Sequence, residues 1–191
     1  MAPRKREQLL DTAETLFYEE GFHATGIDRV IAMAGVARMT LYNHFPSKEA
    51  LIEAVLTRRY RRYLDDLKHA VANRGEATAV AALARRHGAW LESSSPNGCI
   101  VLQAIAEFEH HHPPIANLGR QFKRELVGVI ATALAADGQA ADTVSAERIL
   151  VVLEGANALV PVLGPKAATA HLDVLLPAVL TPTQHPVGEP T

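Results

Sequence analysis

The sequence predicts an all-α protein in which a long fourth helix joins an N-terminal domain of three helices to a C-terminal helical domain. Three observations predict this fold class. Ala and Leu dominate the composition, strand-like alternation of apolar and polar residues does not persist, and apolar residues recur at helical spacing. We expect about nine helices, with domains at residues 1–62 and 63–180 and a disordered tail at residues 181–191.

The first three predicted helices are separated by turns that contain glycine. The first covers residues 5–20, where apolar residues recur every three or four positions. The second covers residues 27–34 and ends at Gly35, and the third covers residues 37–45 and stops before Pro46. Two short helices joined by a tight turn with glycine are typical of a helix-turn-helix.

The fourth predicted helix begins after Ser47, a good N-terminal cap, and continues to about residue 72. We place the domain boundary within it, near Arg62, because the charge balance changes there. Residues 1–62 contain ten Lys or Arg and eight Asp or Glu, whereas residues 63–191 contain nine and thirteen. The basic end of the chain is therefore its N-terminal end.

Five further helices are predicted after a break at residues 73–75. Pro161 and Pro177 lie inside the apolar patterns of the last two and are expected to kink or shorten them. The five helices are expected at residues 77–91, 99–109, 115–136, 145–163 and 167–180.

Composition excludes several classes of protein. No apolar run reaches the roughly 18 residues that a membrane-spanning helix needs. The N-terminus lacks the apolar core of a secretory signal, and a single cysteine cannot form an internal disulfide. We therefore expect a soluble cytoplasmic protein with no membrane partner.

The residues from Gly35 to Lys48 combine polar, basic and aromatic side chains with few apolar ones. Helical spacing places Val36, Leu41 and Phe45 on the inward face of the third helix. The remaining side chains then face outward, where they can reach base edges and phosphates.

Residues 9–56 resemble the N-terminal DNA-binding domain of the TetR/AcrR family of transcriptional regulators. The resemblance covers about a quarter of the chain and implies a homodimer that binds a double-stranded DNA operator and responds to an unknown small-molecule effector. It implies no cofactor, metal or catalytic residue. The shared positions are Ala13, Leu16, Phe17, Gly21, Phe22, Ala24, Thr25, Ile27, Ala34, Gly35, Val36, Thr40, Leu41, Tyr42, His44, Phe45 and residues 47–51.

The resemblance and the helix geometry together predict the DNA contacts. Arg38 is expected to bind guanine, because a guanidinium can form two hydrogen bonds with this base. Thr40, Tyr42 and Lys48 are expected to bind phosphates, as their family counterparts often do, and Lys48 also lies at a helix N-terminus. The complete predicted set is Thr25, Arg29, Arg38, Met39, Thr40, Tyr42, Asn43, His44 and Lys48.

Two positions depart from the family pattern. Gly26 and Ala37 stand where the family usually has Ser or Thr as helix N-caps. Gly is a tolerable cap and Ala is a poor one, so we expect a ragged start of the third helix. Arg4, Lys5 and Arg6 precede the domain and are interpreted as a mobile arm.

The resemblance also predicts that the last two helices form the dimer interface. The alternative is that their apolar stripes belong to the core of a single chain, because helical periodicity shows burial without naming the partner. The predicted interface residues are Ile149, Val152, Leu153, Ala156, Leu159, Val160, Leu172, Leu175, Leu176 and Val179, with small residues Gly155, Ala156 and Ala158 permitting close approach.

The family places its ligand cavity between the fifth, sixth and seventh helices. Apolar walls and polar side chains that bind the effector are expected there, and plain core packing is the alternative for each residue. The predicted ligand-binding residues are His87, Trp90, Cys99, Leu102, Gln103, Ile105, Glu107, Phe108 and Phe122, with Leu118 as a further wall residue.

These features together predict a repressor that binds a palindromic operator and is released by a small-molecule effector. The first alternative is a regulator that senses thiol chemistry or a metal through Cys99 or His111, with Glu107 and His87 as further metal ligands. The second is an all-α enzyme. No nucleophile–base pair, phosphate-binding loop or clear metal set supports an enzyme.

Overall fold

The computed structural model describes residues 2–180, with side chains from Arg4 onward. Within these residues the chain forms nine helices and no strand, which confirms the all-α prediction. The predicted tail at residues 181–191 lies outside the described residues. The helices are α1 (Ala2–Glu20), α2 (Ile27–Ala34), α3 (Arg38–His44), α4 (Lys48–Ala72), α5 (Ala79–Ser94), α6 (Ile100–Phe108), α7 (Pro113–Ala136), α8 (Thr143–Leu163) and α9 (Pro165–Leu180).

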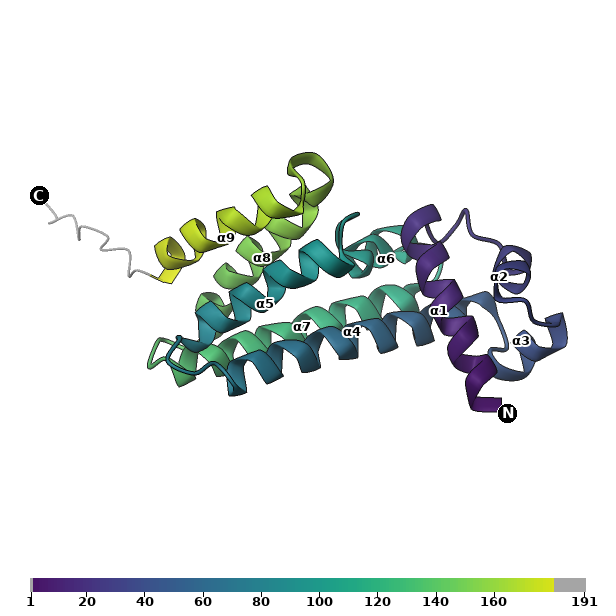
Figure 1. Ribbon diagram of the computed structural model, residues 1–191, viewed down its shortest axis with the longest axis horizontal. Coiled ribbons are helices and arrows are strands. Elements are labelled where there is room, and N and C mark those ends of the chain that lie inside the picture. Colours follow the sequence, from purple (N-terminus) through teal and green to yellow (C-terminus); the bar gives the residue numbers. More distant parts are fainter. Residues whose placement is uncertain (1, 181–191) are drawn as a thin grey trace, which may run out of the picture.

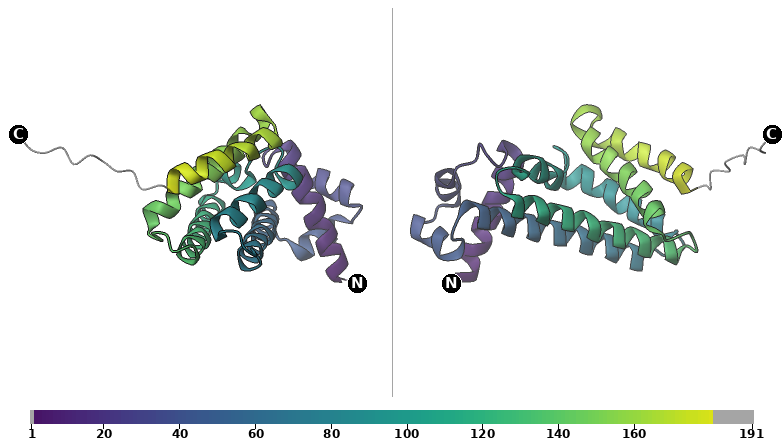
Figure 2. Two further views of the ribbon diagram at one scale, coloured as in Figure 1. Left: turned by 60° about the vertical axis from the view of Figure 1, so that its left-hand side comes forward. Right: turned by 180° about the vertical axis from the view of Figure 1, so that it is seen from behind.

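The molecule is elongated, with α1, α2 and α3 gathered at one end (Figure 1). The long helices α4 and α7 run side by side away from this end, and α5 packs beside them. Helices α8 and α9 pair with each other and cover α5, as both views in Figure 2 also show. A single cluster of buried apolar side chains extends from α1 to α9. The helix-turn-helix end is therefore continuous with the rest of the core.

Helix α4 passes through residue 62 without a break and carries buried side chains on both sides of that position. Its apolar positions from Leu51 to Leu67 follow the helical period. Ser47 caps its N-terminus, since the Ser47 hydroxyl oxygen accepts a hydrogen bond of 3.1 Å from the Ala50 amide. One rigid element thus connects the two ends of the molecule.

The prediction of weak caps at the helix-turn-helix is confirmed. Gly26 and Ala37 are the N-caps of α2 and α3, and neither supplies a side-chain hydrogen bond. Gly35 ends α2 in the left-handed conformation, with φ of 60°. Glycine adopts this conformation at little cost, so the tight turn between α2 and α3 depends on it.

Several predicted boundaries were wrong by a few residues because capping groups lie elsewhere. Asp142, not a later residue, caps α8 by accepting a hydrogen bond of 2.9 Å from the Ser145 amide. Asp137 lies far away in the sequence but accepts hydrogen bonds from the amides of Ala79 and Val80, at 2.6 and 2.9 Å. Helices α8 and α9 continue through their internal prolines, so neither helix is shortened.

The interpretation of residues 4–6 as a mobile arm was also wrong. These residues form part of α1, and the Arg6 guanidinium carbon lies 5.2 Å from the centre of the Phe45 ring. Among the helices of residues 2–180, none is both long and apolar enough to span a bilayer.

Candidate functional site

Helix α3 lies at the end of the molecule away from α9 (Figure 1), and most of its residues are polar. Leu41 and Phe45 are buried, and Val36 packs partly buried against the same core, as predicted. On the other side, Arg38 is 58% exposed at its side chain and Met39 is 68% exposed. Tyr42 and Asn43 are exposed as well, while Thr40 and His44 are half-buried. The exposed side chains of this face can contact a large partner without any rearrangement of the helices.

Acidic neighbours hold the two arginines of this face. Arg38 Nη2 donates to Asp28 Oδ1 of α2, and Arg29 Nη2 lies 2.9 Å from Glu20 Oε1 of α1. All four side chains are exposed, so each ion pair contributes little stability and is screened by salt. A partner with several negative charges can therefore compete for both guanidinium groups.

Thr25 is a correction to the predicted site. Its side chain is fully buried, and its hydroxyl donates to the backbone carbonyls of Gly21 and Leu16, at 2.8 and 3.2 Å. Its amide also bonds to the Gly21 carbonyl oxygen. Thr25 closes the turn after α1 and is not available to a DNA backbone.

Lys48 is half-buried at the first turn of α4. Burial lowers the pKa of its ammonium, although the nearby carboxylates of Glu49 and Glu107 oppose this effect. Lys48 therefore lies near enough to Glu107 of α6 for the two charges to interact.

The helix-turn-helix end rests on α6. Phe22 meets Phe108 edge to face, with ring centres 5.6 Å apart, and the His23 ring lies 5.1 Å from the same phenylalanine. The Tyr18 hydroxyl donates to the Gly98 carbonyl at 3.2 Å and accepts a hydrogen bond of 2.6 Å from the Asn97 amide. Movement of α6 or of the loop before it would therefore act directly on α1.

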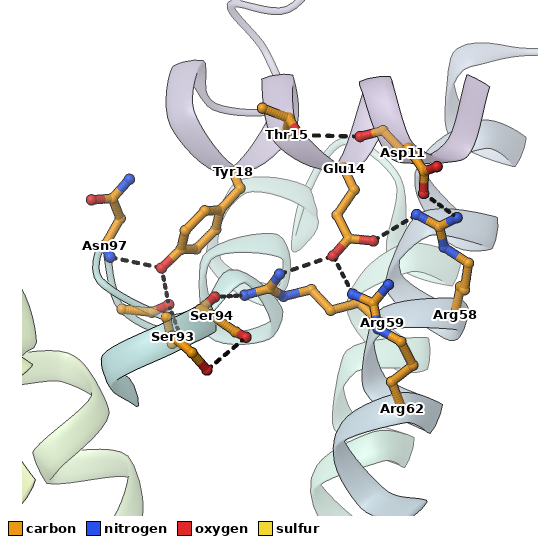
Figure 3. A network of polar contacts seen from close by, with 12 residues as sticks. Asp11, Glu14, Thr15, Tyr18, Arg58, Arg59, Arg62, Ser93, Ser94 and Asn97 are labelled. Atoms are coloured by element: carbon orange, nitrogen blue, oxygen red, sulfur yellow. Dashed lines mark hydrogen bonds and ion pairs between the residues drawn. The ribbon is translucent and has the colours of Figure 1, made fainter. Parts of the chain in front are cut away.

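A second connection passes through Glu14 of α1 (Figure 3). Its carboxylate accepts hydrogen bonds from Arg58, Arg59 and Arg62 of α4, at 2.8, 2.9 and 2.5 Å. Burial alone would raise the pKa of Glu14, but the hydrogen bonds from Arg58 and Arg59 and the charge of Arg62 lower it. The carboxylate therefore stays ionised in this contact.

Arg59 is the central residue of this network. Its Nη2 donates to the Ser94 carbonyl at the end of α5 (Figure 3). Its guanidinium carbon also lies 4.7 Å from the Tyr18 ring centre and 5.2 Å from the Trp90 ring centre. One cation on α4 thus contacts both α1 and α5.

Most of the predicted ligand-binding residues do not meet in one cavity. Gln103 donates to Glu107, and Glu107 faces His23 of the helix-turn-helix end. Leu102 is exposed, and Phe108 packs on Phe22. These residues of α6 therefore either contact the helix-turn-helix end or face solvent, and they do not line a common ligand cavity.

Two further predicted residues are buried in the core. His87 lies between the Tyr63 hydroxyl and the Leu153 carbonyl, and burial lowers its pKa to about 4. Phe122 stacks on Tyr60, with ring centres 4.7 Å apart. The alternative of plain core packing therefore describes His87 and Phe122.

Trp90 and Cys99 do line an internal cavity of about 30 Å³ between α4, α5, α6, α7 and α8. Most of its lining residues could not be predicted from the sequence. The lining residues are Arg59, Tyr60, Tyr63, Trp90, Ser95, Cys99, Ile100, Val101, Lys123, Glu154 and Asn157.

The cavity contains a largely buried ion pair. Lys123 Nζ lies 2.6 Å from Glu154 Oε1 and 3.2 Å from Cys99 Sγ. Burial would lower the pKa of Lys123, but Cys99 and Glu154 raise it, so the ammonium stays charged. The sequence does carry a signal for Glu154, because it is the one charged residue within the apolar run 149–163.

Cys99 is half-buried, and burial raises the pKa of its thiol although Lys123 opposes this effect. The helix N-terminus therefore does not make it a thiolate by itself. Among the described residues, no group of three or more His, Cys, Asp and Glu side chains is arranged to hold a metal ion. His111 lies beside the His23 ring, with centres 6.1 Å apart. The metal-sensing alternative thus has no geometric support.

Helices α8 and α9 expose an apolar surface, and its residues differ from those predicted for the dimer interface. Most of the predicted residues face the protein's own core, including Leu153 and Leu172, which are almost completely buried. Only Leu159 and Leu175 of that set are strongly exposed apolar side chains. The outer apolar surface consists of Val144, Val151, Leu159, Val162, Leu163, Val174 and Leu175.

Comparisons with known proteins agree with this geometry. Residues 9–55 match the family model described as bacterial regulatory proteins, tetR family. The HTH-type transcriptional repressor KstR2 of Rhodococcus jostii (strain RHA1) is 43% identical over 63 residues, which are 33% of this chain and 29% of that protein. The HTH-type transcriptional activator FasR of Mycolicibacterium smegmatis is 39% identical over 67 residues, which are 35% of this chain and 31% of that protein. The chain thus spans about 30% of the length of these curated relatives.

The similarity between whole chains is structural. The crystal structure of SCO4454, a TetR-family transcriptional regulator from Streptomyces coelicolor, superimposes with a TM-score of 0.85 and 29% sequence identity. The match covers 92% of this chain and 94% of that chain, so it includes the C-terminal helices as well as the helix-turn-helix.

Proposed function

We propose that this chain is a TetR-family regulator, and specifically a ligand-responsive transcriptional repressor that binds a palindromic operator as a homodimer; the match of residues 9–55 to the tetR family model and the similarity of the whole chain to a TetR-family regulator support this. The exposed polar face of α3 is the observation that carries this proposal. Proteins of this family are DNA-binding regulators, and this chain is not an enzyme. It acts in the cytoplasm, where it meets double-stranded DNA.

Helix α3 enters the major groove of the operator. Arg38 exchanges Asp28 for a guanine edge, and Met39 and Asn43 contact neighbouring bases. The DNA backbone is bound by Arg29, Thr40, Tyr42, His44 and Lys48, with Arg29 exchanging Glu20 for a phosphate.

The outer surface of α8 and α9 forms the dimer interface. Its exposed valines and leucines lie on two adjacent helices, and Gly155 and Ala158 on α8 permit close approach. Two subunits related by a two-fold axis at this interface would have to place their α3 helices about 34–36 Å apart. This distance is the spacing of successive major grooves on one side of the DNA.

Release follows from a shift of α4 and α6 relative to α1. The internal cavity borders Arg59, and Arg59 contacts both Glu14 of α1 and the end of α5. An effector that enlarges this cavity favours a conformation in which the two α3 helices no longer match the groove spacing.

A second candidate function is thiol sensing through Cys99, favoured by its contact of 3.2 Å with Lys123. The ammonium would stabilise a thiolate once the cavity opens. Replacing Cys99 with Ser should then abolish the response of DNA binding to oxidants, and an unchanged response removes this candidate.

An electrophoretic mobility shift assay with the DNA upstream of the chain's own gene tests the main proposal. We expect specific, salt-sensitive binding, because phosphate contacts release counterions from DNA. Random DNA of equal length is the control. If the upstream and random fragments bind equally at every salt concentration, the proposed function is wrong.

A further inference from the structure

Two polar atoms in the wall of the internal cavity lack a hydrogen-bond partner. Within the described residues, the Tyr60 hydroxyl and Glu154 Oε2 are buried and have no protein atom to bond. Buried polar groups in native proteins are nearly always paired, because an unpaired group has lost its hydration without compensation. Both residues line the same cavity, so one small molecule placed between them could satisfy both.

The charges around the cavity indicate a neutral molecule. Lys123 is already paired with Glu154, and Arg59 is paired with Glu14 on the side of α1. An added anion would lie against the Glu154 carboxylate, and an added cation would lie against Lys123 and Arg59. Neither ion would find an unpaired opposite charge among these groups.

The hydrogen-bonding capacity of the two unpaired atoms and the aromatic walls of the cavity further restrict the class of ligand. An ionised carboxylate oxygen only accepts, so Glu154 Oε2 requires a donor, whereas the Tyr60 hydroxyl can donate or accept. The rings of Tyr63 and Trp90 lie with centres 5.2 Å apart in the same wall, and Tyr60 adds a third ring. Aromatic walls favour a flat apolar body beside the hydroxyl group.

We propose that the cavity binds a small neutral phenol, whose hydroxyl donates to Glu154 Oε2 and accepts from Tyr60 while its ring packs against Tyr63 and Trp90. The claim that a phenol is the effector rests on the proposed function. The claim that the cavity binds a phenol can be tested without DNA.

The size of the cavity explains how occupancy acts on the rest of the fold. A volume of about 30 Å³ accommodates only one or two water molecules, so an aromatic ring must push the wall outward. Arg59 lines both this cavity and an outer cleft of about 400 Å³ between α1, α4 and the end of α5. A phenol thus enters past Arg59 and displaces the residue that contacts Glu14.

Trp90 provides a direct measurement, because it is the only tryptophan in the chain and it lines the cavity. Its fluorescence, excited where tyrosine and phenol absorb little, is followed during titration of the full-length protein with phenol. We expect a saturable change. Benzene, benzoate and benzylammonium should each bind at least about tenfold more weakly, because they lack the hydroxyl or carry a charge. A phenol titration without saturation, or equal binding of benzene, would overturn the proposal.

Tyr60→Phe tests the unpaired hydroxyl itself. The variant should raise the melting temperature of the ligand-free protein, since it removes a buried group without a partner, and should weaken phenol binding about tenfold. Thr25→Val is the matched control, because the buried Thr25 hydroxyl already bonds to the carbonyls of Gly21 and Leu16 and lies outside the cavity. It should lower the melting temperature and retain phenol binding. A lower melting temperature for Tyr60→Phe would mean that water already satisfies the hydroxyl, and the proposal would be wrong.

The two proposals fail separately. Phenol that saturates Trp90 in a protein without specific DNA binding would contradict the proposed function and support the site. Specific DNA binding by a protein that ignores phenol would contradict the site alone.

Discussion

Single side chains at the DNA-binding end are already engaged with neighbours before any DNA arrives. Arg38 is held by Asp28 and Arg29 by Glu20, on an exposed surface where such pairs contribute little stability. These carboxylates orient the guanidinium groups and also keep the free surface from carrying unpaired positive charge. Sequence periodicity predicted the outward direction of Arg38 correctly, but Thr25 proved to be buried, and the pattern could not reveal an ion pair between two helices.

Arg38→Ala should weaken operator binding by about 1–3 kcal/mol, because a guanidinium that binds guanine with two hydrogen bonds carries that much discrimination. Binding isotherms on operator and random DNA measure the effect. Asp28→Asn is the matched control, since it frees Arg38 and should not weaken binding. An equal loss on both DNAs would make Arg38 a phosphate contact.

His87 should make stability depend on pH. Its folded pKa is lowered from 6.5 to about 4 by burial, so the histidine stays neutral in the native state. Its contribution is complete above about pH 6.5 and is lost as pH falls toward 4, a change of up to about 3 kcal/mol. Urea unfolding across this range should show a steeper loss for the wild type than for His87→Gln.

The exposed histidine His69 on α4 supplies the control for this measurement. His69→Gln should retain the full pH dependence of the wild type. If His87→Gln also retains it, the buried imidazole is not the group responsible.

At the scale of helices, the sequence predicted their number and approximate positions because apolar residues recur with the helical period. It could not predict which partner each apolar face meets. Leu153 and Leu172 follow the period well, yet they pack inside the chain, whereas Val151 and Val162 point outward. Capping by Asp137 of a helix that begins 58 residues earlier is likewise invisible to a local pattern.

The outward apolar surface of α8 and α9 predicts the effect of a charge. Val162→Glu, at a side chain that is 76% exposed, should give a folded monomer, because the carboxylate would be buried unpaired in the dimer. Light scattering after size exclusion measures the mass. Leu102→Glu, at an exposed leucine on α6, should leave the dimer intact. A Val162→Glu protein that stays dimeric would place the interface elsewhere.

At the scale of the whole molecule, the continuous helix α4, the contact with α6 and the network of Glu14 with its three arginines join the helix-turn-helix end to the rest. The fold class and the exposed face of α3 could be predicted from the sequence because the helix-turn-helix motif is local. The internal cavity could not, because its wall combines residues from five helices that only the tertiary structure brings together.

Glu14→Gln should destabilise the protein by about 3 kcal/mol, because it leaves the buried Arg59 without a carboxylate partner, while Arg58 keeps its ion pairs with Glu7 and Asp11. Urea unfolding measures this loss. Glu19→Gln, at an exposed glutamate on the same helix, should have little effect. Equal stability of the two variants would show that the network contributes specificity rather than stability.

The continuity of α4 limits how freely the DNA-binding end can be exchanged between relatives. In a chimera joined at residue 62, positions 14, 58, 59 and 62 all come from the donor, so the contacts of Glu14 with its arginines are not divided. Position 59 of the donor must then pack against Trp90 and Ser94 of this chain. Donors that have arginine there and tyrosine at position 18 should transmit the effector signal. Other donors would yield a chimera that still binds DNA but no longer responds to its effector.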